Sequence, residues 1–197
     1  MTTFLLIRHG ETDELGKELS GRRPGVCLNA AGRRQAEQLA GRLAGEGVAA
    51  VYSGPLERAR ETAQPLAERL GLEVRPAAEL DEIDLGEWSG QSFESLAGRE
   101  DWRLFNTARS CSRPPCGELM LEVQARAVAF IQRLCGEQPG AAVALVSHSD
   151  VIKAVLAYYL GLPLDLAQRL EISPASVSVL ALEEGGPRVL CVNSVEP

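Results

Sequence analysis

Short apolar runs alternate along this chain with longer segments in which apolar residues recur at helical spacing. Residues 4–7, 49–53 and 142–147 have the length and composition of buried strands. Amphipathic segments separate these runs. Because a strand, a helix and a second strand usually form a parallel pair, the alternation predicts an α/β domain with a mainly parallel central sheet.

Residues typical of helix ends bound the amphipathic segments. Asn29 precedes the first, which ends near Gly45 and Gly47, and Gly71 follows the second, whose apolar face runs through residues 56–70. The remaining elements that the pattern predicts are helices over residues 119–134 and 150–160, and a closing hairpin over residues 177–182 and 189–192.

Residues 80–117 interrupt this regular pattern. They contain both tryptophans, a Pro-Pro pair and several Gly and Ser residues. We interpret the segment as an irregular insertion with a short helix around residues 93–105. With 197 residues and no internal repeat, the chain is expected to form a single domain over residues 1–197.

The net charge of −7 argues against a nucleic-acid partner, because such proteins gain affinity from an excess of Lys and Arg. The start of the chain does not read as a signal peptide, and no apolar stretch is long enough for a membrane helix. The five cysteines are scattered without a C-x-x-C pair, which favours reduced thiols over a disulfide framework or a zinc ribbon. We therefore expect a cytoplasmic protein with no membrane partner.

The two histidines of the chain occupy similar positions. His9 and His148 each follow a predicted buried strand, and ligands of open α/β sheets bind beyond the carboxyl ends of the strands. Arg8 directly precedes His9, and Arg58 lies shortly after the strand that ends at Ser53. Imidazoles and guanidiniums together suit a phosphoryl dianion. Two distant histidines without Cys partners make a poor metal site, so no metal is expected.

Residues 8–12 read Arg-His-Gly-Glu-Thr, which resembles the signature of the histidine phosphatase superfamily, also called the phosphoglycerate-mutase-like family. The resemblance continues through the first helix at residues 32–36, the second arginine at 53–63, the acidic segment at 80–90 and the second histidine at 146–148. The resemblance implies a three-layer α/β/α fold. It also implies an enzyme that acts on a small phosphorylated substrate, transfers the phosphoryl group through a phosphohistidine and needs no cofactor.

The same resemblance assigns roles to five residues. His9 is the nucleophile, and Arg8, Arg58 and His148 stabilise the charge on the phosphoryl oxygens. Glu82 donates the proton to the leaving oxygen and later activates water. Without the resemblance, the sequence does not distinguish Glu82 from its acidic neighbours Asp81 and Asp84.

The chain departs from the family pattern near the substrate. An Asn that many relatives carry six residues after the nucleophile is Leu15 here, and Ser20, Gly21 and Arg22 are candidates to replace its contact. Leu119 stands where a Ser is usual before the long helix, and Ser149 replaces the glycine after the second histidine. We expect Ser149 to narrow the pocket or to add a hydrogen-bond donor.

Three functions fit these residues. A phosphomonoester hydrolase passes the phosphoryl group from His9 to water, whereas a phosphoglycerate mutase returns it to another hydroxyl of the substrate. The compact turn at residues 86–90 resembles the phosphatases and favours the hydrolase. A binding module that has lost turnover is the third, and the presence of all five residues argues against it. The oligomeric state is open between a monomer and a homodimer.

Overall fold

A six-stranded sheet forms the centre of the protein in a computed structural model that describes residues 1–195. The strand order is β3-β2-β4-β1-β5-β6, with β1 to β4 mutually parallel and β5 antiparallel to both of its neighbours. The mainly parallel sheet and the closing hairpin are thus confirmed. The strands are β1 (Thr2–Arg8), β2 (Val48–Ser53), β3 (Val74–Pro76), β4 (Ala142–Ser147), β5 (Val177–Glu183) and β6 (Gly186–Ser194).

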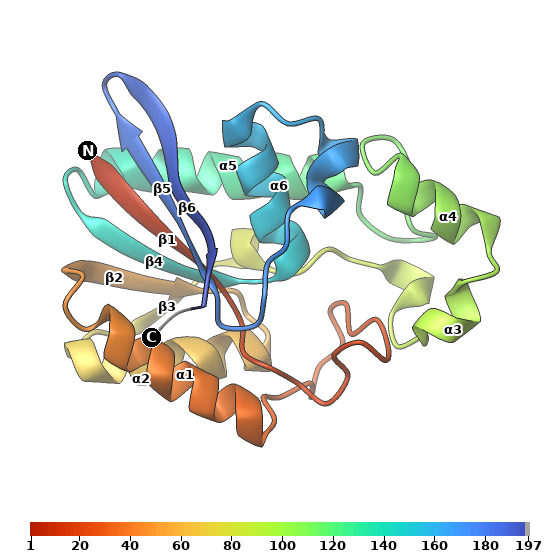
Figure 1. Cartoon of the computed structure of the whole chain (residues 1–197), viewed down its shortest axis with the longest axis horizontal. Helices are drawn as coiled ribbons and strands as arrows, with labels where there is room; N and C mark the ends of the chain where they lie inside the picture. Colours follow the sequence, from red (N-terminus) through yellow and green to blue (C-terminus); the bar gives the residue numbers. More distant parts are fainter. Residues whose placement is uncertain (196–197) are drawn as a thin grey trace.

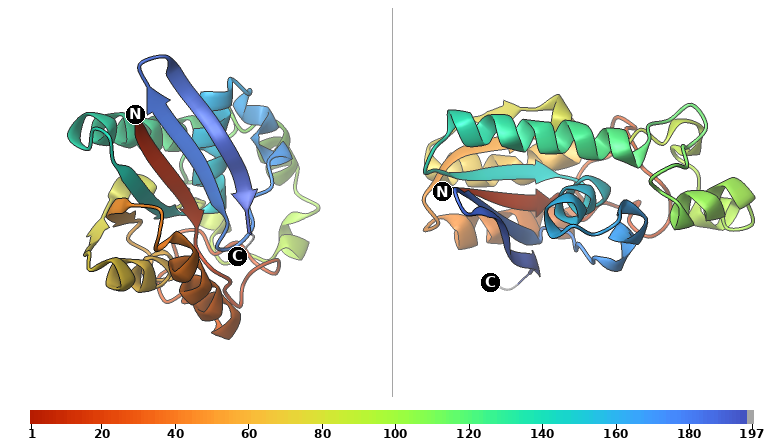
Figure 2. Two further views of the ribbon diagram at one scale, coloured as in Figure 1. Left: turned by 60° about the vertical axis from the view of Figure 1, so that its left-hand side comes forward. Right: turned by 90° about the horizontal axis from the view of Figure 1, so that it is seen from above.

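Helices cover both faces of the sheet, as Figures 1 and 2 show, which confirms the three-layer architecture. Side chains of β1 alternate between the two faces of the sheet. Leu5 and Ile7 pack with the helices of residues 30–43 and 57–70, and Phe4 and Leu6 pack with the helices of residues 120–137 and 149–160. None of the helices within residues 1–195 is long and apolar enough to cross a membrane. One face carries α1 (Ala30–Leu43) and α2 (Glu57–Leu70), and the other α5 (Met120–Glu137) and α6 (Ser149–Leu160).

The segment of residues 80–117 lies beyond the carboxyl ends of the parallel strands (Figure 1). The expected single helix is wrong, because the chain leaves the helical conformation at Arg99 and forms two helices. Trp88 is fully buried there against Trp102 and Phe105, with ring centroids 5.4 Å away in both contacts. The short elements around this segment are η1 (Ala78–Leu80), η2 (Gly86–Trp88), α3 (Phe93–Leu96), α4 (Glu100–Thr107) and, later, η3 (Leu164–Arg169).

The start of α1 packs backbone to backbone against the loop that follows β1. A Cβ atom on Gly32 would lie 2.1 Å from the carbonyl oxygen of Glu11, and one on Gly10 would lie 2.7 Å from the carbonyl oxygen of Gly32. The Asn29 side chain accepts a hydrogen bond from Gly32 N at 2.8 Å and so caps the helix, as the sequence predicts. The helix therefore fixes the path of the residues next to His9.

We expect Gly32→Ala to destabilise the protein by about 1–3 kcal/mol, because its methyl group would meet backbone that cannot rotate away. Gly41→Ala, in the same helix, is the matched control, since beyond the adjacent residues and the surrounding helix backbone no atom lies within 4 Å of its added methyl group. That change should stabilise the protein by about 0.5–1 kcal/mol through helix propensity. Urea unfolding of both variants measures the difference, and equal effects would contradict this packing.

Candidate active site

Three parallel strands bring the two histidines to the same edge of the sheet. His9 follows β1 and donates its backbone N–H to Ser147 O at 2.9 Å, at the end of β4. Gly54, after β2, donates to Val146 O at 3.0 Å on the other side of β4. The ring centroids of His9 and His148 are consequently 5.1 Å apart. The predicted convergence of strand ends is what the structure shows.

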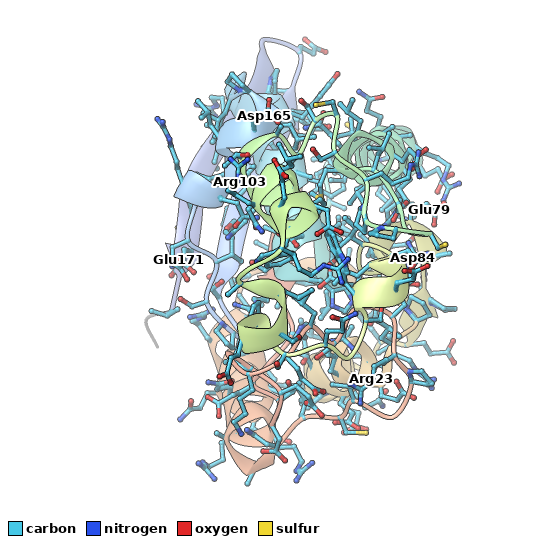
Figure 3. All side chains as sticks on the ribbon, turned by 90° about the vertical axis from the view of Figure 1, so that its right-hand side faces the viewer. Arg23, Glu79, Asp84, Arg103, Asp165 and Glu171 are labelled. Carbon is cyan, nitrogen blue, oxygen red and sulfur yellow. The ribbon has the colours of Figure 1, made fainter. Side chains whose placement is uncertain are left out.

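Figure 3 looks onto this edge of the molecule. Helix α4, which carries Arg103, lies in front of the strand ends. It lies between the segment that carries Asp165 and Glu171 and the segment that carries Asp84. The irregular segment of residues 80–117 therefore covers part of this edge of the sheet.

His9 is held in one tautomer by its own backbone. Its Nδ1 lies 2.7 Å from the carbonyl oxygen of Gly10, which can only accept a hydrogen bond. The proton therefore resides on Nδ1, and Nε2 keeps a lone pair. Burial lowers the pKa of His9 well below its usual value, and the nearby charges of Arg58 and Arg8 lower it further. His9 is thus a neutral imidazole with a nucleophilic Nε2 at neutral pH.

Two guanidiniums flank His9, that of Arg58, which is buried, and that of Arg8, which is half-buried. Arg58, on α2, is 1% exposed and donates from Nη2 to Gly21 O at 2.7 Å. Arg8 donates from Nη1 to Ile172 O at 2.6 Å. Within residues 1–195, Arg58 Nη1 and Arg8 Nε are buried without a hydrogen-bond partner. Buried donors of this kind are normally satisfied, so these atoms indicate a site for an anionic ligand.

Several hydrogen bonds position Glu82 across the strand ends. Ser147 Oγ donates to Leu80 O at 2.7 Å and so attaches the acidic segment to β4. Arg22 and Arg126 both donate to the backbone carbonyl of Glu82, at 2.7 and 3.2 Å. The carboxyl group then lies with Oε2 3.6 Å from Nδ1 of His148.

Burial raises the pKa of Glu82 to about 7, and the negative charge of Asp150 contributes to the increase. The positive charges of Arg58 and Arg8 and the N–H of Ile83 act in the opposite direction. The pKa of His148, in contrast, is well below its usual value because its ring is fully buried among cations. Near neutral pH the site thus contains neutral imidazoles and a carboxyl group that can hold or release a proton.

A cavity of about 170 Å³ opens above these groups. Among the predicted substrate-binding residues, Ser20, Gly21 and Ser149 line it. Arg22 does not line the cavity, and its side chain donates instead to Glu82 O and to Glu118 Oε2. The lining also includes Arg8, His9, Arg58 and Glu82, with Thr12, Glu14, Leu15, Gly16, Glu18, Leu19, Ile83, Leu85, Phe93 and Asp150.

The sequence analysis did not single out Asp150 or Arg109. Asp150, in the first turn of α6, lines the cavity and accepts a hydrogen bond from Arg109 Nη1 at 2.9 Å. Arg109 comes from the segment after α4, is only 5% exposed, and lies over the ring of Phe105. The place of Asp150 two residues after His148 was a usable signal, whereas nothing in the local sequence marks Arg109 as its partner.

The chain belongs to the histidine phosphatase superfamily (branch 1), whose model matches residues 4–195. It is 37% identical over 195 residues to a bifunctional protein of Mycobacterium tuberculosis, covering 98% of this chain but 54% of that protein. The chain therefore spans about half the length of the first curated relatives that it matches.

Relatives of similar length include both phosphatases and mutases. A probable phosphoglycerate mutase of Yersinia enterocolitica is 32% identical over 189 residues, covering 93% of this chain and 86% of that protein. A mycobacterial glucosyl-3-phosphoglycerate phosphatase, solved with VO3, is 30% identical with a TM-score of 0.88, and 98% of each chain is covered. The family membership that the motifs indicated is confirmed.

The raised pKa of Glu82 predicts a pH-dependent stability difference for Glu82→Gln. Between the ordinary pKa of 4.5 and about 7, the folded protein keeps a proton that the unfolded chain has lost. The contribution of Glu82 to the free energy of unfolding of the wild type is therefore fully present below pH 4.5 and is lost as the pH rises through 7. Since glutamine does not titrate, the variant should gain in unfolding free energy relative to wild type between pH 5 and pH 8.

Urea unfolding of Glu82→Gln and of the wild type at pH 5 and at pH 8 measures this gain in unfolding free energy. Glu37→Gln, on the exposed face of α1, is the control for replacing a carboxyl group with an amide. A Glu82→Gln difference that is the same at pH 5 and pH 8 would mean that Glu82 is ionised throughout this range.

Proposed function

We propose that the protein is a metal-independent phosphomonoester hydrolase that forms a phosphohistidine on His9 with a small phosphorylated metabolite. The observation that carries this proposal is a neutral, tautomer-fixed imidazole beside two guanidiniums that each have a buried donor atom without a partner. Such an arrangement suits in-line attack on a phosphoryl group whose charge is stabilised by preplaced cations.

The reaction has two displacements. In the first, Nε2 of His9 attacks phosphorus, the bond between phosphorus and the ester oxygen breaks, and Glu82 gives its proton to the leaving alcohol. In the second, water attacks phosphorus, Glu82 takes a proton from that water, and the bond between phosphorus and nitrogen breaks. Arg8, Arg58 and His148 remain in place throughout as donors to the equatorial oxygens. A pKa of about 7 allows Glu82 to act as acid and then as base.

A phosphoglycerate mutase is the second candidate, because a relative of that name is 32% identical. The two functions share the first displacement and differ in whether water or a hydroxyl of the product receives the phosphoryl group. The compact turn of residues 86–90 after Glu82, which contains η2, supports the hydrolase. We further propose a cytoplasmic location, in keeping with five free cysteines, and no nucleic-acid or membrane partner.

Replacing His9 tests the nucleophile. Hydrolysis of p-nitrophenyl phosphate should fall by at least about a thousandfold in His9→Ala, because the covalent route is lost. The wild-type rate should be the same with and without a chelator. Glu37→Gln should leave the rate unchanged. Activity that survives His9→Ala, or that a chelator abolishes, would refute the metal-independent phosphohistidine mechanism.

The fate of 3-phosphoglycerate separates the hydrolase from the mutase. A hydrolase releases inorganic phosphate, whereas a mutase converts the compound to 2-phosphoglycerate without releasing phosphate. Phosphorus NMR of the same reaction measures both products. Formation of 2-phosphoglycerate as the main product would replace the hydrolase assignment with the mutase.

The charge of Asp150 should contribute, together with burial of Glu82, to the alkaline limit of activity. Activity decreases as Glu82 loses its proton, near pH 7, in the first displacement. In Asp150→Asn a negative charge is removed while Arg58, Arg8 and the freed Arg109 remain, so the pKa of Glu82 falls. The alkaline limb of kcat/KM for p-nitrophenyl phosphate should move to lower pH. An unchanged limb would mean that Asp150 does not influence the acid.

A further inference from the structure

The cavity above His9 is a ligand site on grounds that do not depend on its acidic residues. Arg58, which lines it, is 1% exposed and has a buried Nη1 atom without a partner in residues 1–195. The cavity holds about 170 Å³, below the several hundred cubic ångströms of pockets that enclose drug-sized molecules. A phosphoryl group occupies part of this space, so the alcohol attached to it is small.

The charges that line the cavity are unevenly distributed. Arg8 and Arg58 are its only Lys or Arg side chains within the described residues, and both are assigned to the phosphoryl group in the proposed mechanism. Four carboxyl side chains line the same cavity: Glu14, Glu18, Glu82 and Asp150. A substrate with a second negative group on its alcohol would therefore find no lining cation left to bind it and would approach carboxylates instead.

Three of these carboxyl groups already have a partner or a task. Glu18 pairs with Arg23 at 2.6 Å, and Asp150 pairs with Arg109 at 2.9 Å. Glu82 serves as the proposed acid. Glu14 differs, because its Oε2 is buried without a hydrogen-bond partner in residues 1–195. A carboxylate oxygen that is buried without a hydrogen bond costs free energy. A hydrogen-bond donor, especially a positively charged one, would remove that cost.

Apolar side chains complete the wall around Glu14. Leu15 and Phe93 line the cavity and are 40% and 38% exposed, although both are large hydrophobic residues. Leu19 lines it as well. Carbon atoms of a short alcohol can pack against these side chains, and the face of Phe93 also favours a cation over an anion.

We propose that the substrate is a small phosphomonoester whose alcohol carries a protonated amine, and that Glu14 recognises the ammonium group while Leu15 and Phe93 contact the carbon chain. This inference rests on the proposed hydrolase function. It also makes Glu14 a specificity-determining residue, in the loop where the family's usual Asn is replaced by Leu15.

Three phosphate esters of nearly equal size test the proposal: ethanolamine phosphate, 2-hydroxyethyl phosphate and phosphoglycolate carry an ammonium, a hydroxyl and a carboxylate at the same position. Wild-type kcat/KM should be highest for the ammonium compound and lowest for the carboxylate. A charge-assisted hydrogen bond predicts a preference of ammonium over hydroxyl of about tenfold or more. Glu14→Gln should bring this ratio close to one.

Glu37→Gln, an equal change of charge on exposed α1, should leave the ratio at its wild-type value. Glu14→Lys should invert the order and favour phosphoglycolate. Because each readout is a ratio within one protein, partial loss of folded enzyme does not alter it. A wild-type ratio at or below one, or a ratio unaffected by Glu14→Gln, would overturn the proposal while p-nitrophenyl phosphate hydrolysis leaves the hydrolase function intact. Failure to hydrolyse any of the four compounds would instead overturn the hydrolase function itself.

Discussion

Burial of the Arg58 guanidinium is the physical constraint on which the rest of the site depends. A cation taken out of water costs several kcal/mol unless charges and hydrogen bonds replace its hydration. Here Gly21 O accepts one bond, and the carboxyl groups of Glu82, Asp81, Glu57 and Glu14 surround the cation at longer range. Burial, together with the positive charges of Arg58 and Arg8, lowers the pKa of both imidazoles and keeps them neutral. The unpartnered Nη1 atom is left for an anion.

The sheet supplies the precision that such a site requires. Neighbouring parallel strands end together, and the backbone bonds of His9 and Gly54 to β4 continue the ladder past the last strand residues. The Gly10 N–H donates to the Thr62 hydroxyl at 3.0 Å, and that hydroxyl donates to Arg58 O at 2.7 Å. The loop that carries His9 and the buried cation Arg58 are thereby connected through α2, and neither can shift without the other.

The sequence could reveal the histidines because strand ends have a local signature: an apolar run that stops at a polar residue. It could not select Glu82 from its neighbours, since all three side chains are acidic. In the structure the Asp81 carboxylate accepts from Glu82 N, and that of Asp84 accepts from Gly86 N, so both stabilise the turn. Arg22 was a candidate substrate contact, because an arginine in a loop can point toward the cavity or away from it. In the structure Glu82 O and the Glu118 carboxylate hold its side chain, and no local sequence pattern reveals these partners.

The same tertiary contacts connect substrate choice with proton affinity. The segment of residues 80–117 contributes Glu82 and Phe93 to the cavity, and through Arg109 it holds Asp150, whose charge raises the pKa of Glu82. Arg109 lies over Phe105, and Phe105 packs against the buried Trp88 that follows the acid. A change in this segment that reshapes the cavity for another alcohol would therefore also move Arg109 relative to Asp150. In the proposed hydrolase, substrate range and pH optimum should therefore change together.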